Sequence, residues 1–219
     1  MVVRGNFENS LQDLQAKMKT MSDLAAASLE KSFEALKTKD VELALKVIDE
    51  DEVVDDLDTE INHFIIWLLA KEQPVARDLR KIIGALKISS EIERIADFGV
   101  NIAKSTIKIG NADSLVNISI LEKMKDLSIK MLQKGLDSFL NGDIALAKEV
   151  GELDDEVDQF SGDAYKLMTG YLKDHPEETE HMVQLLLINR YLERTADHIT
   201  NIAESAAYLI KGQMYDLNS

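Results

Sequence analysis

Two segments of this chain, ERIADFGVNIAKS (residues 93–105) and ERTADHITNIAES (residues 193–205), are close copies of each other. They are identical at eight of thirteen positions, at a constant offset of 100 residues. Apolar residues in both segments recur at intervals of three and four, which is the period of an α-helix that is buried on one side. A match this close within one chain indicates an internal duplication, and it predicts that the two halves fold alike.

The duplication continues outward from these two segments. Residues 40–55 match residues 143–158 at an offset of 103, and the two prolines, Pro74 and Pro176, stand at corresponding junctions. Proline cannot continue a helix, because it has no backbone N–H and its ring clashes with the preceding turn. Helical periodicity between such breaks predicts three helices per half, at about residues 7–37, 41–71 and 77–109, and then 120–140, 144–173 and 177–210.

The composition agrees with a helical protein. The chain has 219 residues, with only ten glycines and two prolines, and it lacks β-rich runs separated by turn signals. Long helices with short loops explain this composition best. We therefore predict an all-α fold of two tandem, pseudo-symmetric three-helix bundles, residues 1–110 and 111–219, with a loop at Gly110–Ser114 between them.

Several classes of protein are disfavoured by the composition. The chain has no cysteine, which excludes disulfide bonds and thiolate metal ligands. No run reaches the roughly 18 apolar residues that a membrane-spanning helix needs, and the first residues do not resemble a secretion signal. We expect a cytoplasmic protein.

The net charge is −15, and it is unevenly distributed. This charge disfavours a general nucleic-acid binder, and it disfavours direct docking on anionic lipid, so we expect membrane contact only through partners. Residues 49–60 contain eight acids and no base, and residues 152–163 contain six acids and no base. Without these fourteen acids, 26 acids face 25 bases, so the negative excess is local and needs an explanation.

Acidic residues in both halves fall at helical spacing beside apolar faces. The acids of the repeated segments lie four residues apart, as do two acids in each acidic window, so each pair shares a helix face. Val47 and Val54 bracket the first acid of one window at heptad-compatible spacing, and Val150 and Val157 do the same in the other. The candidate ligands, including one Asn per row, are Asp51, Asp55, Glu93, Asp97, Asn101, Asp154, Asp158, Glu193, Asp197 and Asn201.

Carboxylates beside a bundle seam repel one another and lose hydration, so they must be protonated, paired with a basic side chain or bridged by a cation. Arg94 and Arg194 directly follow the two glutamates and point about 100° away, so they could pair only sideways or with another chain. A cation fits better, and sites made only of oxygen suit magnesium, calcium, manganese or clustered iron. The alternative is that the acids form solvated helix faces.

Other candidate residues carry less weight. Two E-x-x-H patterns, at residues 60–63 and 178–181, are not at equivalent repeat positions, and we interpret both as surface features. His198 has Phe98 as its counterpart, so no paired role is indicated. No motif for nucleotide binding, nucleophilic catalysis or a zinc protease occurs, and we do not expect an enzyme.

The two segments that contain the repeated motif resemble those of a known family. EQPVARDLRKIIGALKISSEIERIADFGVNIAK (72–104) and INRYLERTADHITNIAESAAYLIKG (188–212) are similar to segments of the PhoU family of bacterial phosphate-uptake regulators. The resemblance covers essentially the whole chain. It implies a cytosolic protein of two symmetric three-helix bundles, commonly a homodimer, that acts as a negative regulator of the phosphate-starvation response.

The resemblance also implies partners and a cofactor. Family members are thought to be adaptors between the ATPase of a phosphate ABC transporter and a phosphate-sensing histidine kinase. Their E(D)-x-x-x-D motifs bind metals, including multinuclear iron or zinc, so the expected cofactor is iron, zinc, manganese or magnesium. Carried over, the motifs are Glu93 with Asp97 and Glu193 with Asp197, facing Asp51, Asp55, Asp154 and Asp158, with Asn101 and Asn201 in the same rows.

Lys104 stands where the second half has Glu204, an asymmetry that could make the two sites unequal. Two other hypotheses remain open. A ferritin-like di-iron protein would need ligands from four helices of one bundle, whereas each half supplies three. A metal-free acidic scaffold that binds a basic partner would show strong salt dependence.

Overall fold

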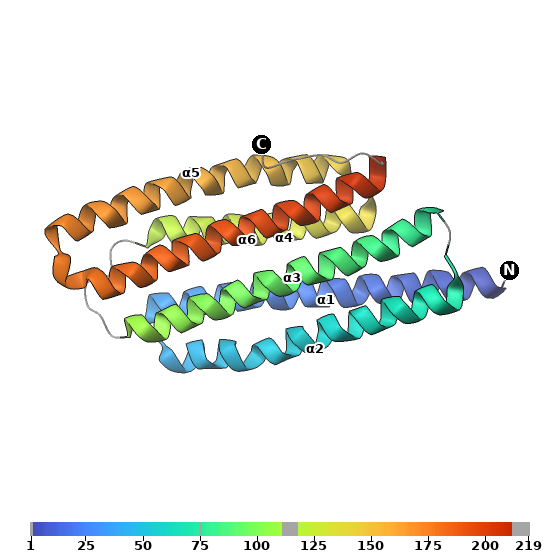
Figure 1. Ribbon diagram of the computed structural model, residues 1–219, viewed down its shortest axis with the longest axis horizontal. Helices are drawn as coiled ribbons and strands as arrows, with labels where there is room; N and C mark the ends of the chain where they lie inside the picture. The colour runs from blue at the N-terminus through green and yellow to red at the C-terminus, as the bar shows by residue number, and fades with distance from the viewer. Residues whose placement is uncertain (1, 75, 111–117, 212–219) are drawn as a thin grey trace.

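Each half of the chain folds into three long helices, as the repeat predicts. The computed structural model describes residues 2–74, 76–110 and 118–211, and these residues contain no strand. The helices, drawn in Figure 1, are α1 (Val2–Thr38), α2 (Val41–Glu72) and α3 (Ala76–Ile109), followed by α4 (Ser119–Asn141), α5 (Ile144–Asp174) and α6 (Thr179–Lys211).

The helix ends follow local capping chemistry. Asp40 and Asp143 precede α2 and α5, and each accepts a hydrogen bond at 2.9 Å from a backbone N–H of the first turn, that of Leu43 and that of Ala145. Aspartate is a preferred residue at this position because it satisfies an N–H that the helix leaves free. Gly142 ends α4 in the left-handed conformation with φ 71°, where glycine has no steric penalty.

Two predicted boundaries were wrong. The first helix begins at Val2 and spans 37 residues, whereas apolar periodicity placed its start near residue 7. The last helix begins at Thr179, because a 3₁₀ turn, η1 (Pro176–Glu178), precedes it. Proline suits this tight turn, and the hydroxyl of Thr179 donates a hydrogen bond to the carbonyl of Pro176 at 2.6 Å. Residues 111–114 of the predicted loop lie outside the described residues.

The two bundles pack side by side through their inner helices. Helices α1, α2 and α3 contact one another, as do α4, α5 and α6, and the halves meet where α3 packs on α6 and α1 on α4. Figure 1 shows α2 and α5 at opposite edges of the molecule, each beside the inner helices of its own half. Within each half, the second helix packs against the third.

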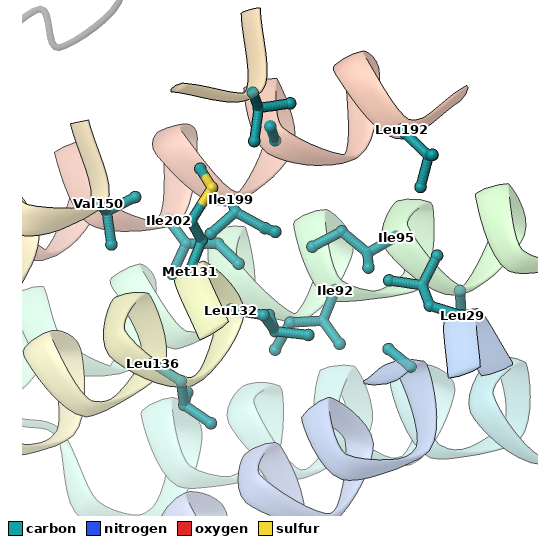
Figure 2. Close-up of a cluster of buried hydrophobic side chains, with 14 of the residues drawn as sticks. Leu29, Ile92, Ile95, Met131, Leu132, Leu136, Val150, Leu192, Ile199 and Ile202 are labelled. Atoms are coloured by element: carbon teal, nitrogen blue, oxygen red, sulfur yellow. The ribbon is translucent and has the colours of Figure 1, made fainter. Parts of the chain in front are cut away.

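One apolar core runs through both bundles. Leu29, Ile92 and Ile95 from the first half belong to the same buried cluster as Met131 and Ile199 from the second. Figure 2 shows these side chains lying between helices of the two halves. No helix in the described part of the chain combines the length and apolarity needed to cross a membrane.

Candidate metal centres

The first carboxylate site lies between α2 and α3. Asp51 and Asp55 lie one turn apart on α2, and Glu93 and Asp97 lie one turn apart on α3. Asp51, Glu93 and Asp97 are partly buried, whereas Asp55 is exposed. The four acids influence one another electrostatically, so the structure brings together the two motifs that the sequence predicted would face each other.

Burial and repulsion perturb this first site. Burial raises the pKa of Asp51 to about 6, repulsion from Asp55 and Asp97 adds to the rise, and the ammonium group of Lys104 opposes it. The pKa of Glu93 is also raised, mainly by burial and then by the charge of Asp97. The site therefore disfavours its own negative charge, as expected of carboxylates that lack sufficient compensation.

The second site, between α5 and α6, repeats this arrangement with deeper burial. Asp154 is only 6% exposed, and its Oδ1 atom is buried without a hydrogen-bond partner among the described residues. Burial, and then repulsion from Asp158 and Asp197, raise its pKa to about 6. The pKa values of Asp158 and Asp197 are raised by burial and then by the charge of Glu193.

Exposed arginine side chains offset part of the negative charge at the solvent side of both sites. Arg94 donates a hydrogen bond to Asp97 at 3.0 Å and lies 3.6 Å from Glu93. This corrects the view that Arg94 points away from the site, because residues three apart on a helix are neighbours. Arg190, which the repeated motif does not include, donates a hydrogen bond to Glu193 at 2.6 Å. The same i, i+3 spacing could have revealed it.

In the second half, the asparagine predicted to border the acids lies elsewhere. Asn201 lies toward the first bundle, where its amide donates to Glu91 of α3 at 3.4 Å. The same Glu91 oxygen lies 2.6 Å from Nδ1 of His198. The repeat could not reveal this role of His198, because its counterpart is Phe98 and the contact joins one half to the other. Asn101 is partly buried.

The two E-x-x-H patterns remain outside these sites. Glu178 lies 2.8 Å from the ring of His181, and Glu60 lies 2.7 Å from Lys17 of α1. His63 is exposed. Neither pattern adds a ligand to the carboxylate sites.

Comparison with known proteins gives the family. The model of the PhoU domain matches residues 18–106 and 121–206, which together make up most of the chain. The chain belongs to the PhoU family. The matched ranges contain both carboxylate sites of this PhoU chain, one site in each matched range.

Full-length relatives of this PhoU chain are found in several bacteria. The phosphate-specific transport system accessory protein PhoU homologue of Clostridium acetobutylicum is 31% identical over 218 residues, covering 99% of this chain and all of the relative. The homologue of Rhizobium meliloti is 31% identical over 207 residues, covering 94% of this chain and 87% of the relative.

Crystal structures of relatives have the same fold. The phosphate transport system regulatory protein PhoU of Streptococcus pneumoniae superposes with a TM-score of 0.89 at 30% identity, covering 96% of this chain and 99% of that one. PhoU of Pseudomonas aeruginosa also gives 0.89, at 29% identity, covering 94% of this chain and all of that one.

The chemical type of the donor atoms at both sites suits a hard cation. The converging groups are all oxygen donors, and the buried Oδ1 of Asp154 has no partner among the described residues. As placed, no three acidic or histidine side chains in the described part of the chain lie close enough together to hold an ion. Cation binding would therefore require these side chains to rotate toward one another.

Proposed function

We propose that this PhoU chain is a non-enzymatic regulator of phosphate uptake. In this role it represses the phosphate-starvation response when phosphate is plentiful. The observation that supports this best is the full-length match to phosphate transport accessory proteins, at 31% identity over 218 residues. The match covers 99% of the chain, so it includes both halves.

We further propose that the chain is a cytoplasmic adaptor between the transporter ATPase and a phosphate-sensing histidine kinase. Its two units would be residues 1–110 and 111–219. Exposed apolar side chains on both halves, among them Ile66, Ile83 and Tyr165, support contact with partners and assembly as a homodimer. Light scattering of the purified chain would measure the mass of the assembly.

The adaptor would contain two metal sites. Asp51, Asp55, Glu93 and Asp97 would hold one ion or cluster, and the corresponding acids of α5 and α6 would hold the other. A bound iron, zinc, manganese or magnesium ion would supply the positive charge that these carboxylates lack. Asn101, which is partly buried in the row of Glu93 and Asp97, would border the first site as a neutral oxygen donor.

Genetic complementation would test the regulatory role. In a bacterium that lacks its own PhoU gene, a phosphate-starvation reporter is active even in rich phosphate, and this chain should silence it. Affinity capture should retain the transporter ATPase and the kinase. A chain that leaves the reporter active and retains neither partner would contradict the proposal.

Metal analysis of the purified chain would test the cofactor. Protein prepared without added metal should contain iron, zinc, manganese or magnesium above background, and the double variant Asp97→Ala/Asp197→Ala should lose it. Asp56→Ala/Asp163→Ala, which removes two exposed acids, is the matched control. Iron-dependent oxygen consumption would instead favour a ferritin-like protein, and partner binding that weakens with salt but ignores chelator would favour a metal-free scaffold.

A further inference from the structure

Helix α2 lies at one edge of the molecule (Figure 1), and its exposed side is divided into an acidic part and an apolar part. Residues 49–60 contain eight acids and no base, whereas residues 61–71 contain no acid. In the second part, the side chain of Ile66 is 63% exposed and that of Trp67 is 43% exposed. An exposed apolar patch that includes a tryptophan is typical of a surface that contacts another protein.

Neighbouring side chains of the same helix orient the Trp67 ring. It stacks on Phe64 with the ring centres 5.5 Å apart, and the ammonium group of Lys71 lies 4.3 Å from its centre. A large aromatic ring that is already oriented loses little conformational entropy when a partner covers it. Trp67 is therefore suited to be the central contact of an interface.

The exposed residues of α2 are spaced symmetrically about Glu60. Val53 lies seven residues before Glu60 and Trp67 lies seven residues after it. Asp49 lies four residues before Val53, and Lys71 lies four residues after Trp67. These intervals keep all five residues on one stripe of the helix, and all five are exposed. The order along the stripe is acid, apolar, centre, apolar, base.

This order complements itself when it is read backwards. If two copies of α2 pack antiparallel about a twofold axis near Glu60, Trp67 and Ile66 of each copy meet Val53 of the other, and Lys71 meets Asp49. Each contact then occurs twice, as a twofold interface requires. The two Glu60 side chains lie near the axis, and the charge of each is offset by Lys17 of its own chain at 2.7 Å.

We propose that the exposed stripe of α2 is the interface of a closed homodimer, in which α2 packs antiparallel on α2 of a second copy. This inference deepens the homodimer proposed above by assigning its contact surface. The apolar residues supply the buried area, and the opposite charges at the two ends of the stripe fix the antiparallel register. The contact would extend over about 33 Å, the length of 22 helical residues.

Helix α5 does not repeat this stripe, although it lies at the opposite edge. At the offset of 103, Glu156 and Gly170 stand where α2 has Val53 and Trp67. Glu152 and Asp174 stand where α2 has Asp49 and Lys71, so the same antiparallel contact would bring acids against acids. Like charges that face each other oppose association. One self-complementary edge per chain closes the assembly at two copies.

Analytical ultracentrifugation of the full chain tests the assigned surface. The wild type should sediment as a dimer, and Ile66→Glu should raise the dissociation constant by about tenfold or more, because Ile66 is among the apolar residues buried at the contact. Leu167→Glu is the matched control. It places the same charge at an apolar residue of α5 that is 42% exposed, and it should leave the dimer intact.

Reversal of charge gives the decisive variants. Asp49→Lys and Lys71→Glu should each weaken the dimer severalfold, and the double variant Asp49→Lys/Lys71→Glu should recover the affinity of the wild type. The two residues are about 33 Å apart along one helix, so they cannot compensate each other within one chain. Recovery therefore requires that residue 49 of one copy meets residue 71 of the other.

A crosslink near the axis checks the register. The chain has no cysteine, so a single substitution gives one thiol per copy. Thr59→Cys lies beside the proposed axis, and a short bis-maleimide should join two copies through it. Gly162→Cys is the control, because it is exposed at the corresponding position of α5 and should remain uncrosslinked.

The outcomes separate this inference from the proposals on which it rests. A wild-type chain that sediments as a monomer would overturn the homodimer and this inference together, whereas silencing of the reporter tests the regulatory role independently. A dimer that Ile66→Glu leaves intact, or a double charge variant that is weaker than both single variants, would overturn only this inference. Ile66→Glu that remains dimeric but no longer captures the ATPase or the kinase would assign the stripe to that partner instead.

Discussion

At the scale of single residues, Asp51 and Asp154 are the most strongly perturbed groups of the two sites. Burial is the main cause in both, and repulsion from neighbouring acids adds to it, so that each pKa is raised to about 6. Near neutral pH, these two carboxylates are therefore ionised at a free-energy cost in the metal-free folded protein. They do not have this cost in the unfolded chain, where water surrounds them. This electrostatic penalty is what a cation, a proton or a neutral substitution would relieve.

The pH dependence of stability follows from the direction of these shifts. Asp154 has a higher pKa in the folded state, about 6, than the ordinary value of 3.8 for an aspartate, so its contribution to stability is complete below that ordinary value and is lost as pH rises through about 6. In chelator at about pH 7.5, Asp154→Asn should therefore be more stable than wild type, by on the order of 2 kcal/mol. The gain should shrink at about pH 5.

Urea unfolding of both proteins at the two pH values would measure this difference. Glu50, whose pKa is lowered mainly by a hydrogen bond from Lys31, is present in both proteins and cancels in the comparison. A difference in unfolding free energy that stays constant, or grows as the pH falls, would show that burial does not raise the pKa of Asp154.

At the scale of helices, the two halves solve the same packing problem differently. Gly99 lets α3 approach α1, because a Cβ atom there would lie 3.1 Å from the backbone carbon of Ser28. The repeat places Ile199 at the corresponding position of α6, and there it is α4 that supplies the glycine, Gly135. Close approach of the first and third helices is thus kept in both halves, although the small residue lies on a different helix.

Replacing this glycine tests the close approach. Gly99→Ala gains about 1 kcal/mol of helix propensity but introduces overpacking that costs about 1–3 kcal/mol. The clash should win, because backbone atoms of Ser28 cannot rotate away, and the variant should be less stable than wild type. Gly162→Ala on α5 is the control, since no atom lies within 4 Å of its added Cβ, and it should be more stable. Urea unfolding that shows stabilisation by both substitutions would contradict the packing argument.

At the scale of the whole molecule, the two halves are joined by polar contacts as well as by their common core. Lys125 of α4 is buried and lies 2.6 Å from Glu30 of α1, and His198 lies 2.6 Å from Glu91. Neither contact is repeated by symmetry, since Ser22 and Phe98 stand at the positions that correspond to Lys125 and His198. These polar contacts therefore favour one orientation of the two halves relative to each other, in addition to the apolar core that they share.

A shared core predicts cooperative unfolding. Separating the halves would expose the apolar faces of α3 and α6, so neither half should remain folded when the other unfolds. Differential scanning calorimetry of the metal-free chain should show one transition, with equal calorimetric and van't Hoff enthalpies. Two resolved transitions would mean that the bundles are independently stable.

The sequence by itself determined the helices, the duplication and which acids share a face of one helix. Helical periodicity, the two prolines and the caps at Asp40 and Asp143 act over a few residues, so they can be recognised in the chain without its fold. The motif at Glu93 and Asp97 and its copy were predicted for the same reason, because spacing along a helix defines a common face. Only the start of α1 and the turn at Pro176 differed.

The tertiary structure decided what meets across helices. The contact of Glu91 with His198, the hydrogen bond from Asn189 to Ser161, and the fit of Gly99 against Ser28 join residues that are far apart in the chain. A repeat pattern says that two halves fold alike, but it does not say which members of a helix face lose contact with water. Burial depends on how the helices of both halves pack together, and that packing buries Asp154 more deeply than its counterpart Asp51.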